Sequence, residues 1–209
     1  MTGAKSGARR SLRVALEEGK TWTFATAVDW PGWCRRGKGT EAAIEELDSY
    51  RDRYRSIVGE TLPAGSIEVI GRVPGGGGTD FGAPMETGPW DDEPVKRADA
   101  DRLGRILQAC WSYFDGVVAA SPAELRKGPR GGGRDRDKMV DHVREAERSY
   151  ASRFGVRVPP RTPWPEQRAL LLASVAEHPA DARWPLRYAV RRIAWHVTDH
   201  AWEMEDRRS

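Results

Sequence analysis

Apolar and polar residues alternate in two short runs near the start of the chain. The alternating apolar positions are Leu12, Val14 and Leu16 in the first run and Trp22, Phe24 and Val28 in the second. A period of two is typical of a strand with one buried face, so each run predicts a strand. Gly19 and Lys20 supply the turn between the two runs, and Asp29-Trp30-Pro31-Gly32 ends the second.

The pattern changes to a helical one after Thr40, which we predict as the helix N-cap, with Glu41 favourably placed near the positive end of the helix dipole. One helical face carries Ile44, Leu47, Tyr50 or Tyr54, and Ile57. A last strand is expected over Ser66–Val73. Residues 1–72 are therefore predicted to form a small α+β module with the order strand, strand, helix, strand.

The next stretch, residues 73–94, is dense in Gly and Pro and shows neither a helical nor a strand period. Such a composition indicates a linker or a long loop, and the domain boundary is placed inside it.

From Val95 onward apolar residues recur at helical spacing, in four segments separated by Pro- or Gly-rich loops. We expect helices that end before Ser121-Pro122, over Arg134–Phe154, through Leu170–Val175, and from about Pro185 to Arg207. The inward residues of the last helix are Leu186, Val190, Ile193, Val197, His200 and Met204. Four such stripes predict an all-α four-helix bundle over residues 95–209.

The composition of the chain bears on its partners and its location in the cell. The 34 basic and 31 acidic residues nearly cancel, and the densest basic stretch is interrupted by Gly and Asp, so no nucleic-acid partner is expected. No apolar run reaches the roughly 20 residues that span a bilayer, so no membrane association is expected either. Two cysteines make no disulfide framework, which favours a cytoplasmic location.

Three of the four histidines suggest a metal site. His196 and His200 are four residues apart on the last helix, so both imidazoles lie on one face and can reach a single ion. His142 occupies the inward face of the second helix, between Met139 and Ala146. Three imidazoles at one point would bind zinc, nickel or iron, with an open position for water or substrate. The alternative is three separate histidines, each packed or exposed by itself.

Other side chains are candidate supports of this site. Asp199 and Glu203 flank the histidine pair, and either could orient a ligand imidazole or simply lie on the solvated face. Trp164 and Trp184 flank the third helix, where they either line the mouth of a pocket or fill the core. His178 precedes Pro179 and is interpreted as a helix-end or surface residue.

The segment Val95–Arg207 resembles the DinB-like superfamily, which includes the mycothiol-dependent maleylpyruvate isomerases. The resemblance is carried by Asp141–Arg148, which reads DHVREAER, and Ile193–Glu203, which reads IAWHVTDHAWE. The metal triad of that family takes one ligand from the second helix and an i, i+4 pair from the last, and His142, His196 and His200 fit these places. The resemblance implies thiol-dependent isomerisation, thiol S-transfer or hydrolysis of a small molecule.

The segment from Arg13 to about Val58 resembles the HicB-like antitoxin fold. The match rests on two strands, the motif Trp30-Pro31-Gly32-Trp33 and the helix start at Gly39–Ala43. The resemblance implies a small partner-binding or regulatory module without catalysis of its own, although a second domain follows here in place of a DNA-binding helix pair.

Two functional hypotheses follow. In the first the protein is a divalent-metal-dependent enzyme, a thiol-dependent S-transferase or isomerase that uses a low-molecular-weight thiol. In the second it is a non-catalytic, metal-stabilised binding or regulatory protein whose HicB-like module recognises a protein partner. The catalytic and cofactor-binding residues, the metal, the substrate and the oligomeric state stay open.

Overall fold

The computed structural model describes residues 11–128, 133–177 and 182–208, and these form an α+β protein with two compact units. The sheet unit comprises the described residues up to Asp29 and those of Cys34–Glu86. The helical unit comprises Trp30–Trp33 and the described residues from Thr87 onward. His178 lies outside the described residues. Within the described ranges, no helix has the length and apolar character needed to cross a membrane.

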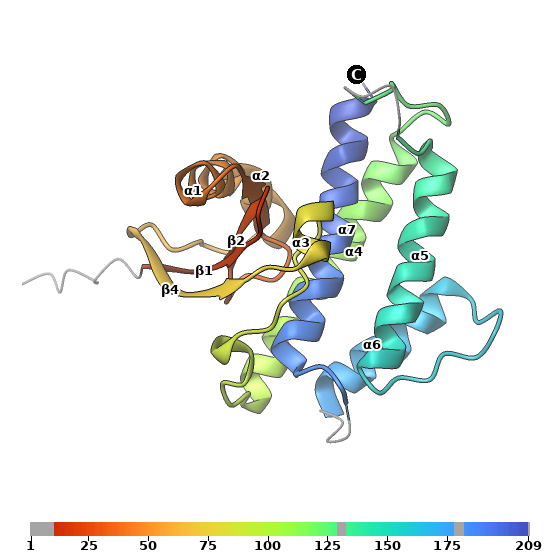
Figure 1. Cartoon of the computed structure of the whole chain (residues 1–209). Coiled ribbons are helices and arrows are strands. Elements are labelled where there is room, and N and C mark those ends of the chain that lie inside the picture. Colours follow the sequence, from red (N-terminus) through yellow and green to blue (C-terminus); the bar gives the residue numbers. More distant parts are fainter. Residues whose placement is uncertain (1–10, 129–132, 178–181, 209) are drawn as a thin grey trace, which may run out of the picture. The chain divides into compact units, whose positions relative to one another are not determined.

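The sheet unit contains a four-stranded mixed sheet with the order β3-β2-β1-β4 (Figure 1). Its strands are β1 (Leu12–Glu18), β2 (Thr23–Ala27), β3 (Cys34–Gly37) and β4 (Ile67–Pro74). β1 pairs antiparallel with β2 but parallel with β4, so the chain between β3 and β4 must return across the sheet. Helices α1 (Thr40–Ser49) and α2 (Arg51–Val58) make this return, and α1 packs on β2 and β3.

The predicted order of elements missed one strand and merged two helices. β3 is an edge strand that, within the described residues, pairs only with β2. Its sequence, Cys-Arg-Arg-Gly, has no apolar alternation, so the hydrophobic pattern did not predict it. Thr40 is the first helical residue rather than the N-cap; Gly39 takes the cap position, with a φ of 88° that favours glycine. The Thr40 hydroxyl instead donates a hydrogen bond to Glu18 Oε1.

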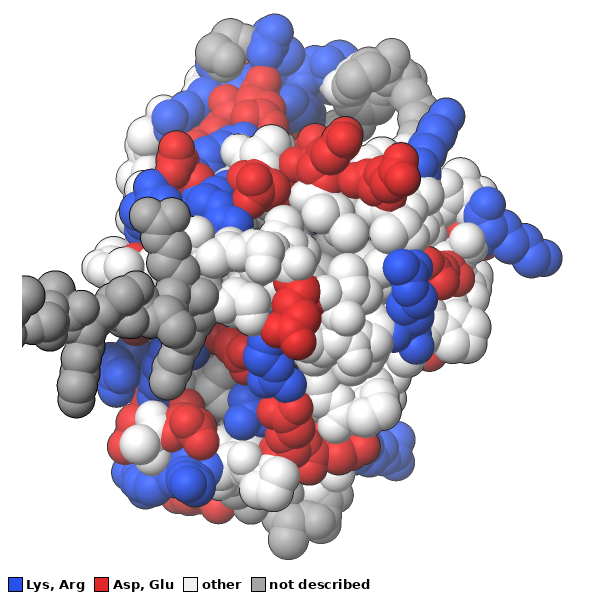
Figure 2. Space-filling model, turned by 90° about the vertical axis from the view of Figure 1, so that its left-hand side faces the viewer, with Lys and Arg blue, Asp and Glu red and all other residues white. Residues whose placement is uncertain are grey.

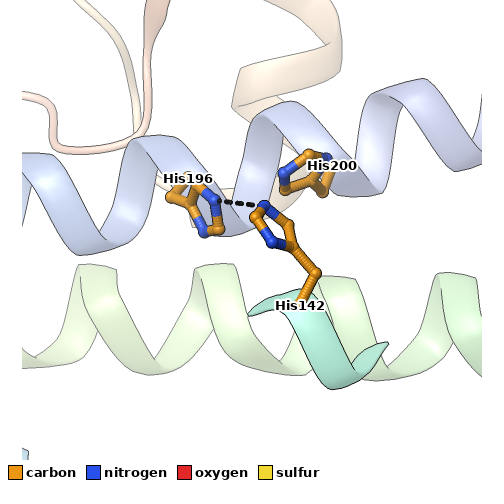
Figure 3. A group of neighbouring side chains, drawn as sticks. All are labelled: His142, His196 and His200. Carbon is orange, nitrogen blue, oxygen red and sulfur yellow. Dashed lines mark hydrogen bonds between the residues drawn. The ribbon is translucent and has the colours of Figure 1, made fainter. Parts of the chain in front are cut away.

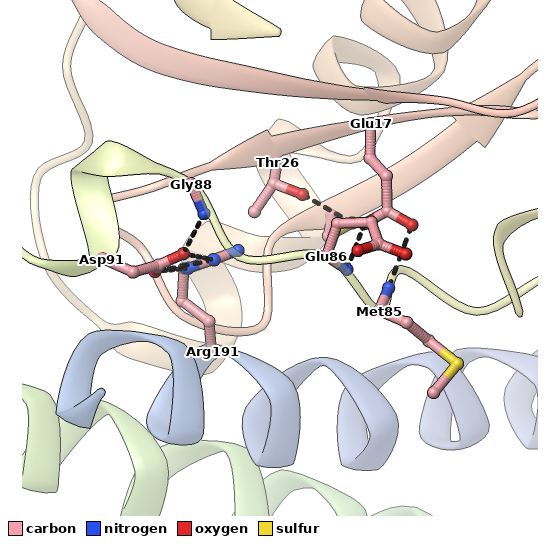
Figure 4. A network of polar contacts seen from close by, with 8 residues as sticks. Glu17, Thr26, Met85, Glu86, Gly88, Asp91 and Arg191 are labelled. Carbon is pink, nitrogen blue, oxygen red and sulfur yellow. Dashed lines mark hydrogen bonds and ion pairs between the residues drawn. The ribbon is translucent and has the colours of Figure 1, made fainter. Parts of the chain in front are cut away.

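The Gly- and Pro-rich stretch over residues 73–94 is more ordered than its composition suggests. β4 runs through Pro74, helix α3 spans Gly77–Phe81, and a 3₁₀ helix, η1, spans Pro89–Asp91. Part of this order comes from Glu17, whose buried carboxylate accepts hydrogen bonds from the backbone N–H groups of Met85 and Glu86 (Figure 4). The Thr79 hydroxyl donates to the same carboxylate. Polar anchoring of this kind has no hydrophobic period and is invisible in the sequence pattern.

The helical unit contains a helix at each of the four expected places. These are α4 (Arg97–Ala119), α5 (Arg136–Arg153), α6 (Trp164–Glu177) and α7 (Leu186–Arg207). α4 packs against α6 and α7, and α5 packs against the same two helices. α6 begins earlier than predicted, at Trp164.

Contacts from outside the four helices fix α7. Arg191 forms a buried bidentate ion pair with Asp91 of η1, at 2.7 and 3.0 Å from Oδ1, and the N–H of Gly88 donates to the same carboxylate (Figure 4). The hydroxyl of Thr198 donates to the carbonyl oxygen of Gly32 at 2.8 Å. A Cβ on Gly32, whose φ is 97°, would lie 3.2 Å from the Thr198 methyl group, so glycine suits this close approach. The Trp-Pro-Gly-Trp segment thus belongs to the helical unit.

Charged side chains on the surface are mixed in sign. Figure 2 shows Lys and Arg interleaved with Asp and Glu over the described part of one face. Several charged residues pair with a partner three or four positions away in the chain, as in Arg51–Asp48, Arg55–Asp52 and Arg97–Asp101. Exposed pairs of this kind add little stability, about 0.5 kcal/mol each.

We expect Glu17→Ala to loosen the segment from Thr79 to Glu86. The substitution leaves one hydroxyl and two backbone N–H groups without their buried acceptor, which should lower the free energy of unfolding by about 1–3 kcal/mol. Limited proteolysis should then cut this segment earlier than in the wild type. Glu68→Ala is the control, because Glu68 is an exposed acid that contacts Ser11. Equal cleavage of both variants would contradict this role of Glu17.

Candidate metal centre

Two antiparallel helices bring the candidate ligands together. His142 on α5 faces His196 and His200 on α7. Eight residues further along α5, Tyr150 faces Arg192, which precedes His196 on α7. The contacts advance along α5 while they recede along α7, so the helices run in opposite directions. The predicted face of α7 is buried as expected, with Ile193 and Met204 almost fully covered.

The three imidazoles meet closely enough to share one ion. One ligand nitrogen from each of His142, His196 and His200 lies within 4.8 Å of the others (Figure 3). The Nε2 atoms of His142 and His196 are 3.2 Å apart. Two nitrogen ligands at about 2.0–2.1 Å from a tetrahedral zinc ion would be about 3.3 Å apart, so this pair fits a common ion.

Burial keeps two of the imidazoles neutral, which is the form that binds a metal. Desolvation, helped by the nearby charges of His200 and Arg134, lowers the pKa of His142 to about 4. Desolvation also holds the pKa of the buried His196 well below its usual range, with further contributions from His200 and Arg192. A neutral imidazole offers a lone pair, so metal binding at neutral pH need not displace a proton from these two residues.

A hydrogen-bonded chain along α7 orients the third imidazole. His200 Nδ1 lies 3.1 Å from Glu203 Oε2, and Arg207 Nη1 donates to Glu203 Oε1 at 2.8 Å. Burial alone would raise the pKa of Glu203, but its hydrogen bonds with His200 and Arg207 and their charges outweigh burial and lower it. A charged Glu203 fixes His200 Nδ1 and leaves Nε2 for an ion. Asp199, the other acid predicted to orient a ligand imidazole, is half-buried on the same helix. The carboxylate that contacts the His200 imidazole belongs to Glu203.

His196 is oriented by aromatic packing. Its ring lies edge-on to Tyr150, with centroids 5.6 Å apart, and 6.0 Å from Trp195. Its Nδ1 atom is buried and has no hydrogen-bond partner among the described residues. The ring is therefore positioned by its neighbours rather than by a second hydrogen bond.

The two flanking tryptophans have different surroundings. Trp184 lies beside Tyr150, with ring centroids 5.5 Å apart, and so belongs to the aromatic group near His196. Trp164 donates its indole N–H to Glu147, a carboxylate that also accepts from Trp111. Trp164 thus takes part in a separate polar cluster.

The sequence pattern did not single out Arg192 or Arg207 as parts of this region. Both lie on the buried side of α7. Arg192 precedes His196 by four residues. Arg207 follows Glu203 by four residues, and Glu203 follows His200 by three. A polar stripe at helical spacing inside an otherwise apolar helix is a signal that could have identified them.

A scan against protein-family models, a search of curated proteins and a search of solved structures each found no match to this chain. The DinB-like and HicB-like resemblances therefore stay predictions, and the metal site is argued from the geometry of its residues.

Without metal, the protein should lose stability as the pH falls from about 6.5 towards 4. In this range the unfolded chain protonates its histidines, whereas the folded chain keeps His142 and His196 neutral, so the free energy of unfolding decreases with falling pH. Urea unfolding of chelator-treated protein at pH 7 and pH 5 measures this loss. His196→Asn removes one of the two groups and should show a smaller difference between the two pH values; an unchanged difference would contradict the assignment.

Glu203→Gln should weaken metal binding about 10- to 100-fold, because the amide cannot replace the charged acceptor at His200 Nδ1. Competition with a chromophoric chelator measures the affinity. Asp199→Asn, an equivalent change one residue before His200, should stay close to the wild type. A larger loss in Asp199→Asn would reverse the roles of the two acids.

Proposed function

We propose that α4–α7 form a four-helix bundle of the DinB-like type around one divalent metal ion, and that the protein is a metal-dependent enzyme acting on a small molecule. The observation that carries the proposal is the convergence of three histidine nitrogens from two helices. The packing of α4 and α5 each against α6 and α7 supports the bundle.

Each residue of the site has a distinct role in this proposal. His142, His196 and His200 hold the ion, and Glu203 orients His200. His142 and His200 are only half-buried, so solvent or a ligand can reach the cluster from their side. A zinc, nickel or iron ion bound there would act as a Lewis acid and would favour the thiolate form of a bound thiol.

Thiol-dependent S-transfer or isomerisation is the reaction class that we favour. Three neutral ligands would leave the full charge of the ion available to an anion, and thiolates are good ligands for such ions. The chemistry would therefore depend on a thiol cofactor and a second substrate held beside the histidines.

Elemental analysis of the purified protein tests the metal site. The wild type should carry about one zinc, nickel or iron ion per chain, and His196→Ala should carry far less because it removes one of three ligands. His178→Ala, the fourth histidine of the chain, should keep the wild-type content. His200→Asn serves as a second ligand variant, and circular dichroism checks that each variant is folded. Equal metal content in all variants would contradict the triad.

A cobalt-substituted form tests the reaction class. Binding of a low-molecular-weight thiol at an open position should change the visible spectrum of the cobalt ion. A spectrum that no thiol or carboxylate alters would mean a closed coordination shell, and would favour the non-catalytic alternative, in which the sheet unit binds a partner.

A further inference from the structure

A tyrosine and an arginine lie at one end of the histidine cluster. The ring of Tyr150 is edge-on to that of His196, at an interplanar angle of 87°. The Nη2 atom of Arg192 donates a hydrogen bond to the Tyr150 hydroxyl at 3.1 Å. Along α7, Arg192 precedes the histidine pair by one helical turn, whereas Glu203 follows it. The two ends of the cluster therefore differ in chemistry.

The hydroxyl of Tyr150 is available as a hydrogen-bond donor. Its oxygen accepts from Arg192, and none of the described residues accepts its proton. The residue is half-buried, so a small ligand at the histidines can approach it. Because one bond to the oxygen strengthens donation through the O–H group, Arg192 makes Tyr150 a better donor as well as holding it in place.

The electrostatic environment at this end favours an anion. Arg192 is buried, with its guanidinium 4.7 Å from the Trp195 ring centroid and 5.1 Å from that of Tyr150. Its charge acts on His196, which lies one helical turn further along α7. At the opposite end, the acid Glu203 is paired with Arg207. An anion would therefore be drawn to the side of Tyr150 and Arg192, where a positive charge is poorly screened by water.

We propose that Tyr150 and Arg192 form a subsite for the carboxylate group of a small substrate beside the three histidines. This inference rests on the proposed function, since it takes the histidine cluster to be a metal centre. One carboxylate oxygen accepts the phenol proton in a hydrogen bond, and Arg192 supplies positive charge and fixes the ring.

The subsite should distinguish oxygen anions from thiolates. A charge-assisted O–H···O bond is short and strong, whereas sulfur is a weak acceptor. A thiol cofactor and a carboxylate substrate could then occupy different places at one centre, with Tyr150 contacting only the carboxylate. The substrate class that follows is a small carboxylic acid.

Titration of the cobalt-substituted protein with acetate tests this subsite. Tyr150→Phe should raise the acetate dissociation constant about tenfold or more, since it removes a hydrogen bond to a charged group. Its cobalt content and its affinity for 2-mercaptoethanol should stay at the wild-type level. The matched control is Tyr113→Phe, which removes a phenol that donates to Glu205 instead, and its acetate affinity should equal that of the wild type.

The outcomes separate this inference from the proposed function. If the wild type binds cobalt and acetate but Tyr150→Phe binds acetate equally well, the subsite is wrong while the metal centre stands. Loss of cobalt from Tyr150→Phe would also overturn the subsite, because Tyr150 would then support the ligands rather than the substrate. If the wild type takes up no cobalt, the proposed function itself fails.

Discussion

Polar side chains buried on α7 must each find a partner, and this constraint organises the helical unit. Sixteen of the 22 residues of α7 are buried, so the helix forms the centre of the unit. The buried polar members and their partners are Arg191 with Asp91, Arg192 with Tyr150, Thr198 with Gly32, and Arg207 with Glu203 and Arg126. An unpaired buried polar group costs about 1–3 kcal/mol, so each pair specifies which segment lies beside which turn of α7.

The histidines are part of the same constraint. His196 is buried and has one ring nitrogen next to His142 and the other without a partner among the described residues. Desolvation keeps both rings neutral, as their lowered pKa values show. A shared metal ion would replace a weak contact between two imidazoles by strong coordination of each, so the same burial that disfavours a protonated histidine prepares the site for an ion.

Sequence patterns predicted the elements that are built on apolar periodicity. The four long helices follow from residues such as Ile193 and Met204, whose burial the structure confirms, and the spacing of His196 and His200 placed both on one face. Elements that depend on backbone or polar pairing were missed. β3 has no apolar alternation, and α3 lies in a Gly-rich stretch beside the buried Glu17.

The choice between Asp199 and Glu203 could not be made from the sequence either. Both acids lie within four residues of a ligand histidine, and a helical pattern alone does not say which carboxylate the imidazole meets. Glu203 is selected in the structure because it accepts from Arg207 on one oxygen and contacts His200 with the other. The deciding partner, Arg207, lies four residues after Glu203, in the last turn of the helix.

α5 differs from α7 in how it is attached. Only four of its 18 residues are buried, and one of these is the charged Glu147. Burial raises the pKa of Glu147, against the opposing charge of Arg168 and the hydrogen bonds from two tryptophans. On one side α5 therefore depends on this polar cluster, and on the other on Tyr150 and His142 facing α7. Because Met139, Val143 and Ala151 are its only buried apolar residues, these polar pairs add to the attachment of α5, and a metal ion that joined His142 to His196 and His200 would be one of its strongest attachments.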